Sequence, residues 1–253
     1  MIVVFQSLSG SPGASVWTTL GSGLWPSDNP LERVGVEADL DGGVMAVRYQ
    51  LESKTDLLLA EAPLAEGAGL GDMSLCAHKV GNRAWLVPGP KAPEAVRRRW
   101  LAAGGVDSVA QLALRDSRVW MFDVGRASPT GVMAPLFASA AVSVLFVRGS
   151  SEELTKVRGR LVELKDTGAH VMVAVTGRLD HREDEVKEFV GTRHVMFLPD
   201  DGHLVEDSRQ VWSGGKRGRR RGVWVAGSAF MEAIAEVLSF SPRGVMRVEA
   251  EAS

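Results

Sequence analysis

Short, nearly continuous apolar segments recur along this chain and alternate with longer segments whose apolar residues lie three or four positions apart. The first pattern is typical of strands buried on both faces of a parallel sheet, and the second of amphipathic helices. The apolar segments predict strands at Ile2–Leu8, Arg33–Ala38, Arg83–Val87, Arg118–Asp123, Val142–Val147, His170–Val175 and His194–Leu198. Because strands and helices alternate, we expect an α/β fold with a mostly parallel twisted sheet and helices on both faces.

Helices are expected between these strands, and glycines, prolines and N-cap residues mark their ends. They are predicted at Val16–Trp25, Asp72–Lys79, Pro93–Ala103, Asp107–Leu114, Pro129–Ala140, Ser151–Lys165, Asp184–Val190 and Ser228–Leu238, with one or two helical turns in Val44–Leu51. No linker or internal repeat divides the chain. We therefore expect one domain over residues 1–240, followed by a polar tail at 241–253.

The composition narrows the class of protein. Of the 253 residues, 45% are hydrophobic and 24% are charged, which is typical of a globular protein. A net charge of −2 provides no overall field that would attract nucleic acid or an acidic membrane. The single cysteine, Cys76, excludes a disulfide within the chain and fits a reducing compartment. The apolar N-terminal segment is too short for a signal peptide or a transmembrane helix, so we expect a cytoplasmic protein without membrane insertion.

A loop of small residues, Ser9-Gly10-Ser11-Pro12-Gly13-Ala14-Ser15, joins the first strand to the first helix. In such a loop, glycines let the backbone approach an anion, and unpaired N–H groups at the helix start point toward it. The loop therefore predicts phosphate or nucleotide binding at Gly10, Ser11, Gly13, Ala14 and Ser15, with an ordinary strand-to-helix turn as the alternative. A P-loop also carries a lysine just before its Ser or Thr, but Ala14 occupies that position here.

Acidic residues follow two of the predicted strands. Glu37-Ala38-Asp39 and Asp41 end the second strand, and Asp123-Val124-Gly125 ends the fourth. Because ligands bind at the carboxyl ends of parallel strands, we expect these acids to lie near the glycine-rich loop. Ser15, Asp39 and Asp123 are the candidate Mg²⁺ ligands, since a hydroxyl and carboxylates hold Mg²⁺ beside a nucleotide. The alternative is that these aspartates only form turns and cap helices.

These motifs together resemble the ParA/MinD family of deviant Walker A P-loop ATPases, over about residues 1–240. The loop of that family reads Lys-Gly-Gly-x-Gly-Lys-Thr/Ser after the first strand. Gly10, Gly13 and Ser15 match this loop, whereas Ser9 and Ala14 stand at the two lysine positions. Glu37-Ala38-Asp39 resembles the acidic-x-Asp motif of the family, and Asp123-Val124-Gly125 resembles its switch II motif. The loop is most similar to those of lysine-poor MinD-like proteins of actinobacteria.

The resemblance implies a P-loop NTPase fold and roles for several residues. Asp39 corresponds to the switch I residue implicated in hydrolysis, and is the candidate catalytic residue. Gly125 would lie beside the nucleotide, while Pro199 and Asp200 stand near where the family holds adenine. The implied ligand is ATP or ADP with Mg²⁺. The implied assembly is a homodimer, in which a lysine at the position of Ser9 crosses the interface.

The two missing lysines imply a weakened enzyme. One cationic or hydrogen-bonding group at the transferred phosphate contributes about 3–4 kcal/mol to a transition state, so we expect weak nucleotide binding and slow or absent hydrolysis. Arg126 and Arg148 each follow a strand and are candidate replacements, with ordinary surface arginines as the alternative. The sequence thus predicts a degenerate ParA/MinD-like protein, a nucleotide-sensing or pseudo-ATPase scaffold or regulator with a protein partner. The processes considered are partitioning, positioning, secretion and conjugation.

The alternative function is an active but slow Mg-ATPase of the ParA/MinD type that also contacts DNA. The candidate DNA contacts form one dense basic segment: Lys216, Arg217, Arg219, Arg220 and Arg221. Basic side chains bind phosphate groups without sequence preference, but a solvated loop or a loop that binds an acidic partner fits the same pattern. The histidines lack metal-ligand spacing and there is no Gly-x-Ser-x-Gly motif, so neither a zinc site nor a serine nucleophile is predicted.

Overall fold

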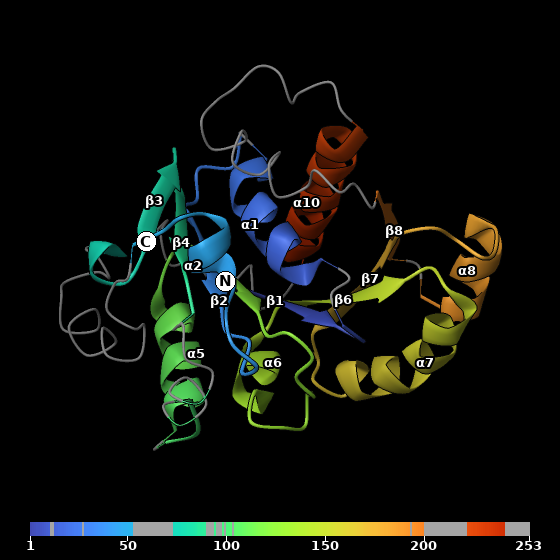
Figure 1. Ribbon diagram of the computed structural model, residues 1–253, viewed down its shortest axis with the longest axis horizontal. Helices are drawn as coiled ribbons and strands as arrows, with labels where there is room; N and C mark the ends of the chain where they lie inside the picture. Colours follow the sequence, from blue (N-terminus) through green and yellow to red (C-terminus); the bar gives the residue numbers. More distant parts are fainter. Residues whose placement is uncertain are drawn as a thin grey trace.

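The computed structural model describes residues 1–10, 13–26, 28–52, 73–89, 94, 98, 100–102, 104–192, 194–199 and 222–240. Within these residues an eight-stranded sheet, in the order β3-β4-β2-β5-β1-β6-β7-β8, forms the centre of the molecule (Figure 1). The strands are β1 (Ile2–Ser7), β2 (Arg33–Glu37), β3 (His78–Gly81), β4 (Ala84–Val87), β5 (Val119–Asp123), β6 (Val142–Arg148), β7 (His170–Thr176) and β8 (Val195–Leu198). All neighbouring pairs are parallel except β3 and β4. The predicted mostly parallel α/β fold is confirmed.

Helices cover both faces of this sheet (Figure 1). They are α1 (Ala14–Leu24), α2 (Met45–Arg48), the 3-10 turn η1 (Met73–Leu75), α5 (Gly105–Arg115), α6 (Ala134–Ser139), α7 (Ser151–Lys165), α8 (Glu183–Val190) and α10 (Gly222–Phe240). α1 and α10 enclose an aromatic core of Phe5, Phe146 and Phe230 on one face. α5, α6 and α7 cover the opposite face through a separate apolar core. This arrangement leaves the carboxyl ends of the central strands open for a site.

α1 and α10 approach each other closely because each presents a glycine to the other. A Cβ atom at Gly21 would lie 2.9 Å from Sδ of Met231, and one at Gly227 would lie 2.6 Å from Cδ1 of Leu24. In the sequence Gly21 only weakens a helix. In the folded protein the lost helix propensity is offset by close packing that fixes α1, and therefore Gly13 at its start.

The segment 72–81 corrects one prediction. A helix is expected at Asp72–Lys79, but the structure has the short turn η1 and then β3, which pairs with β4 as an antiparallel hairpin. Arg83, in the hairpin turn, adopts a φ of +63°. The helix prediction is wrong because Met73, Cys76 and Ala77 are buried in the core while β3 pairs with β4, and such tertiary pairing overrides local preference.

Two other helices, α6 and α10, begin well away from their predicted first residues. α6 begins at Ala134 rather than at Pro129, with Pro135 in its first turn. Proline has no N–H and fits only the first turn of a helix, so a start at Pro129 would place Pro135 in the interior. α10 begins at Gly222, earlier than the predicted Ser228. No helix in the described ranges is long and apolar enough to span a membrane.

Candidate functional site

A cleft of about 370 Å³ lies at the carboxyl ends of β1, β2 and β5, beside the start of α1. Its lining comprises Ser7, Gly10, Gly13, Ala14, Ser15, Val16, Asp39, Asp41, Arg48, Asp123, Gly125 and Arg126. The three strands are neighbours in the sheet, so residues far apart in sequence meet here. The structure therefore brings together the loop and both acidic motifs that the sequence singles out.

The glycine-rich loop enters α1 through a backbone conformation that favours glycine. Gly13 has φ +95° and ψ 10° at the N-cap position, and its carbonyl accepts the N–H of Trp17 at 2.9 Å. A Cβ at this position would also lie 3.3 Å from Cδ1 of Trp17. The first N–H groups of a helix have no partner inside the helix. With no side chain at Gly13 to cap them, the start of α1 presents these donors and its positive dipole end to the cleft.

Asp123 forms the floor of the cleft and is fully buried. Its Oδ1 accepts the N–H of Gly125 at 3.0 Å, whereas its buried Oδ2 has no hydrogen-bond partner among the described residues. Burial raises the pKa of Asp123 to about 7, and the nearby Asp39 and Glu37 carboxylates add to the rise. The Ser15 side chain and the Gly125 N–H favour the charged form and so act to lower this pKa. An unpaired buried oxygen costs about 1–3 kcal/mol, so the fold keeps an acceptor that is ready for a ligand.

Asp39 and Gly125 fit against each other at the side of the cleft. Gly125 has φ +59°, and a Cβ on it would overlap the carboxylate of Asp39. Asp39 Oδ1 accepts the N–H of Asp41 at 2.9 Å, so the turn role that the sequence left open is present as well. Burial raises the pKa of Asp39. The glycine of Asp-x-Gly therefore makes room for the Asp39 carboxylate in the cleft.

Glu37 is not part of the cleft lining and has a structural role. Its Oε1 accepts the N–H groups of Val44 at 2.7 Å and Met45 at 2.9 Å. Its Oε2 accepts the N–H of Gly89 at 3.0 Å. The side chain is buried, which raises its pKa, although these three bonds favour the charged form. Glu37 thus fastens the start of α2 to the end of β4.

Ser9, at one of the two lysine positions of the resemblance, is engaged within its own chain. Its hydroxyl donates to Oε1 of Glu153 in α7, and Oε2 of Glu153 accepts the backbone N–H of Arg148 at 2.8 Å. The Arg148 guanidinium donates from Nη2 to the carbonyl of Gly10 at 3.3 Å. Arg148 is not part of the cleft lining. These contacts fasten the first half of the loop to the junction of β6 and α7.

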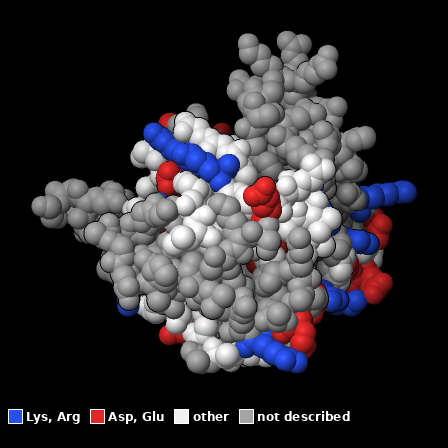
Figure 2. All heavy atoms as spheres, turned by 60° about the vertical axis from the view of Figure 1, so that its left-hand side comes forward, with Lys and Arg blue, Asp and Glu red and all other residues white. Residues whose placement is uncertain are grey.

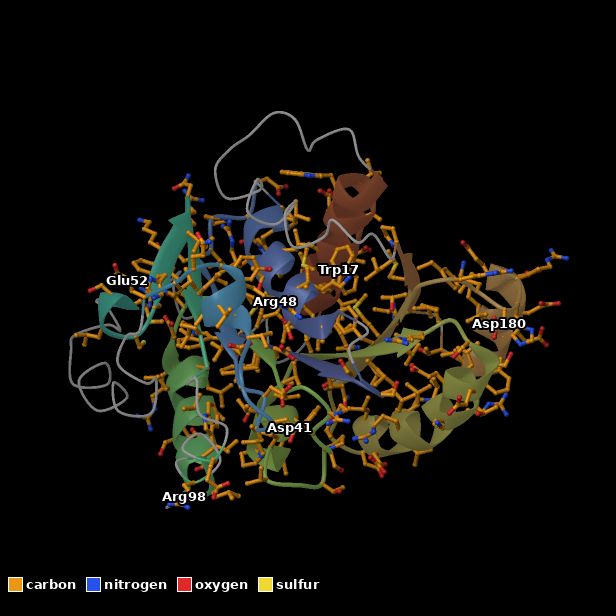
Figure 3. All side chains as sticks on the ribbon, viewed as in Figure 1. Trp17, Asp41, Arg48, Glu52, Arg98 and Asp180 are labelled. Atoms are coloured by element: carbon orange, nitrogen blue, oxygen red, sulfur yellow. The ribbon has the colours of Figure 1, made fainter. Side chains whose placement is uncertain are left out.

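Two arginines line the cleft, Arg126 and Arg48. Nη2 of Arg126 lies 2.8 Å from Oδ2 of Asp41, and both side chains are more than half exposed. Arg48 ends α2, and Figure 3 shows it toward the α1 face, with Asp41 in the loop that reaches toward α6. Sequence reasoning missed Arg48, since no motif marks it. In the sequence, Arg48 is distinguished by nothing more than its position in the segment that follows the acidic end of β2.

Among the remaining predicted site residues that the structure describes, Pro199 is not part of the cleft lining. Pro199 follows β8, the edge strand, and β6 and β7 separate that strand from β1. Ser11 and Asp200 lie outside the described residues, as does the basic segment Lys216, Arg217, Arg219, Arg220 and Arg221.

The donor set fits Mg²⁺ only together with a phosphate ligand. Over the described ranges, no group of three or more His, Cys, Asp or Glu side chains is arranged to hold a metal ion. Mg²⁺ commonly uses one or two carboxylates and completes its shell with water and substrate phosphates. The unpaired Oδ2 of Asp123, with Ser15 and Asp39 in the same lining, suits that mode. A Mg²⁺-phosphate group would supply the positive charge that offsets these acids.

Several solved structures share this architecture. A ParA family ATPase from Chlorobium tepidum is 16% identical with a TM-score of 0.71, covering 91% of this chain and 96% of its own. The septum site-determining protein MinD from Pyrococcus horikoshii, in complex with Mg-ADP, is 13% identical with a TM-score of 0.68, covering 93% and 98%. A variant of McdA from Cyanothece, in complex with ATP, is 13% identical with a TM-score of 0.67, covering 94% and 96%.

The fold of this chain is therefore that of the ParA/MinD-like P-loop ATPases. No protein-family model matches the chain, and no curated protein sequence matches it. The likeness extends over more than nine tenths of each chain, but the identities stay below 20%. Similarity at this level establishes the fold, and the chemistry of the site depends on the residues of this chain.

Proposed function

We propose that this protein is a ParA/MinD-like nucleotide sensor that acts as a scaffold or regulator, in a process such as partitioning, positioning, secretion or conjugation. It binds ATP or ADP with Mg²⁺ weakly and hydrolyses ATP slowly or not at all. Ser15, Asp39 and Asp123 would hold Mg²⁺, and the amides of Gly13, Ala14 and Ser15 would hold phosphate. Binding of nucleotide, rather than its turnover, would be the signal.

One observation carries this proposal. The cleft retains a buried, unpaired carboxylate oxygen on Asp123 beside Ser15, while the lysine position of the loop holds Ala14. Keeping that oxygen unpaired costs folding free energy, which a plain strand-to-helix turn would not require. Losing the cation removes stabilisation of the charge that develops during phosphoryl transfer. The combination favours binding over catalysis, and the similar MinD and McdA structures contain Mg-ADP and ATP.

The partner of such a regulator would be another protein. The Ser9 hydroxyl bonds to Glu153 of its own chain, so the residue at the dimer-crossing position is engaged within that chain. We therefore propose that nucleotide binding is read by a protein partner, and that any homodimer forms without a bridging lysine.

The test is direct binding of nucleotide. Calorimetry with ATP and ADP, each with Mg²⁺, should give weak but saturable binding, with little phosphate release. No binding at millimolar nucleotide would overturn the proposal. Turnover that disappears in Asp39→Ala would instead establish a slow Mg-ATPase, the second candidate, which the retention of Asp39 and Asp123 in one cleft favours.

DNA contact belongs to that second candidate and depends on the basic segment at 216–221. On the face drawn in Figure 2, the basic and acidic side chains of the described residues are interspersed rather than gathered into a patch of one sign. Gel shifts at several salt concentrations should respond to alanine substitution of Lys216, Arg217 and Arg219–Arg221. An unchanged salt dependence would remove this segment as a DNA contact.

A further inference from the structure

The cleft has cations that do not come from its loop. Ala14 stands where a P-loop carries lysine, but Arg48 and Arg126 both line the cleft. A guanidinium binds phosphate oxygens through two parallel N–H groups and keeps its charge at physiological pH. The two arginines can therefore supply the contact that the loop lacks, and the surrounding bonds distinguish between them.

The backbone of Arg126 is fixed next to the phosphate loop. The carbonyl of Gly125 accepts the N–H of Ser7, the last residue of β1, at 2.7 Å. The N–H of Ala127 donates to the carbonyl of Val124 at 3.2 Å, which closes a turn around Arg126. The long side chain of Arg126 thus starts from a fixed point beside the strand that leads into the loop.

The side chain of Arg126 is paired with Asp41 in the lining of the cleft. Nη2 of Arg126 lies 2.8 Å from Oδ2 of Asp41, and the side chains are 58% and 63% exposed. An ion pair with this exposure is weak and is screened by salt. A nucleotide polyphosphate carries more negative charge than a carboxylate and accepts two parallel hydrogen bonds equally well. It can therefore replace Asp41 as the partner of Arg126.

Arg148 and Arg48 are held differently. Arg148 lies outside the lining, where its guanidinium binds the carbonyl of Gly10. Arg48 belongs to α2, a four-residue helix whose start is fastened by Glu37 to the end of β4. Of these arginines, only Arg126 combines a place in the lining with a backbone that is bonded to β1.

We propose that Arg126 is the phosphate-binding cation of this cleft and that Asp41 is the counterion that the phosphate displaces. The proposal rests on the nucleotide binding proposed above, and adds the residue that recognises the terminal phosphates. When nucleotide binds, Arg126 turns from Asp41 toward the start of α1, and Asp41 is released. The two members of one ion pair therefore have opposite effects: removing Arg126 weakens binding, and neutralising Asp41 strengthens it.

The experiment measures calorimetric affinities of Mg-ATP, Mg-ADP and adenosine for the full chain and for Arg126→Ala, Arg126→Lys, Asp41→Asn and Arg48→Ala. Arg126→Ala should lose about tenfold or more in affinity for Mg-ATP, since a charge-assisted hydrogen bond is lost. Arg126→Lys should recover part of that loss, and Asp41→Asn should bind severalfold more tightly than the wild type. Adenosine, which has no phosphate, should bind all variants alike.

A matched control is the ion pair of Arg182 and Asp184 beside α8, at 2.9 Å and with comparable exposure. Arg182→Ala and Asp184→Asn should leave every affinity unchanged. If the wild type binds Mg-ATP and Arg126→Ala binds it equally well, the assignment of Arg126 is overturned while nucleotide sensing stands. Weaker binding by Asp41→Asn would overturn the counterion role. If the wild type itself fails to bind nucleotide, the proposed function fails and this inference fails with it.

Discussion

Glu37 and Asp123 are neighbours in the sheet and have opposite surroundings. They are register partners at the ends of β2 and β5, and both are buried acids whose pKa is raised by burial. Glu37 accepts three backbone N–H groups through its two oxygens. Asp123 accepts one, and its Oδ2 has no hydrogen-bond partner in the described part of the chain. The first acid is satisfied and holds the fold, and the second remains open toward the cleft.

The difference identifies which of the two buried acids is available to bind a ligand. A carboxylate with all of its acceptors used contributes to stability, and its removal leaves buried donors without partners. A buried carboxylate with an unused oxygen lowers stability and gains a partner only when a cation or a proton arrives. Of these two acids on adjacent strands, Glu37 therefore stabilises the structure around the cleft, and Asp123 is available to bind a ligand in it.

The largest expected effect is at the supporting acid. Glu37→Ala should lower the free energy of unfolding by about 3–5 kcal/mol, because three N–H groups lose their acceptor. Chemical denaturation measures this, and Glu94→Ala is the control, since Glu94 is exposed and forms an exposed ion pair with Arg98. A loss below about 1 kcal/mol for Glu37→Ala would contradict the stabilising role of the Glu37 hydrogen bonds.

Asp123→Asn should raise the free energy of unfolding, whereas Glu37→Ala lowers it. The folded pKa of about 7 lies above the ordinary value of 3.8. The folded protein therefore binds more protons between these values, and its stability falls as the pH rises from about 4 to about 7. Above pH 7 the variant should be more stable than the wild type by about 2 kcal/mol, because it removes a buried charge.

Urea denaturation at pH 5 and pH 8 measures this effect. Asn retains an oxygen that can accept the Gly125 N–H, so the gain should appear at pH 8 and shrink at pH 5. Glu37 and Asp39 also have raised pKa values, so part of the wild-type pH dependence should remain. A variant less stable than the wild type at pH 8 would contradict the conclusion that the ionised Asp123 lowers the stability of the folded protein.

A smaller effect is expected at the glycine that admits Asp39 to the cleft. Gly125→Ala should cost about 1–2 kcal/mol, from its positive φ and from contact with the Asp39 carboxylate. Gly191→Ala is the matched control, because Gly191 has φ +69° and nothing within 4 Å of its Cβ position. The steric part should be the difference between the two variants, measured by denaturation. It should disappear when Asp39→Ala is combined with Gly125→Ala.

The smallest expected effect is on ligand binding. Protonated Asp123 is a poor partner for Mg²⁺, so the affinity for Mg-ADP should rise about fivefold from pH 6 to pH 8 as this acid ionises near pH 7. Fluorescence titration with an ADP analogue measures the profile. Asp123→Asn should flatten it, and an unchanged profile in that variant would assign the titration to another group.

Much of the fold could be predicted from the chain alone. Apolar segments identified the strands of the parallel sheet within a residue or two, because buried parallel strands require continuous hydrophobic side chains. The hairpin at His78–Val87 escaped prediction in part, since its first strand is short, partly exposed and defined by pairing with β4. The site could be predicted to the level of the loop, Asp39 and Asp123, because strand ends and glycines are local signals.

The hydrophobic pattern and the positions of glycines and acids are enough to predict the strand–loop–helix framework and the acidic strand ends, and they show that neither loop position holds a lysine. Only the tertiary structure separated Glu37 from Asp123, placed Arg48 and Arg126 in the cleft, and joined Ser9 to Glu153. These outcomes depend on which distant N–H groups and side chains come to lie beside a given residue. Hydrophobic periodicity specifies the elements, but partners far apart in the chain meet only after the sheet is assembled.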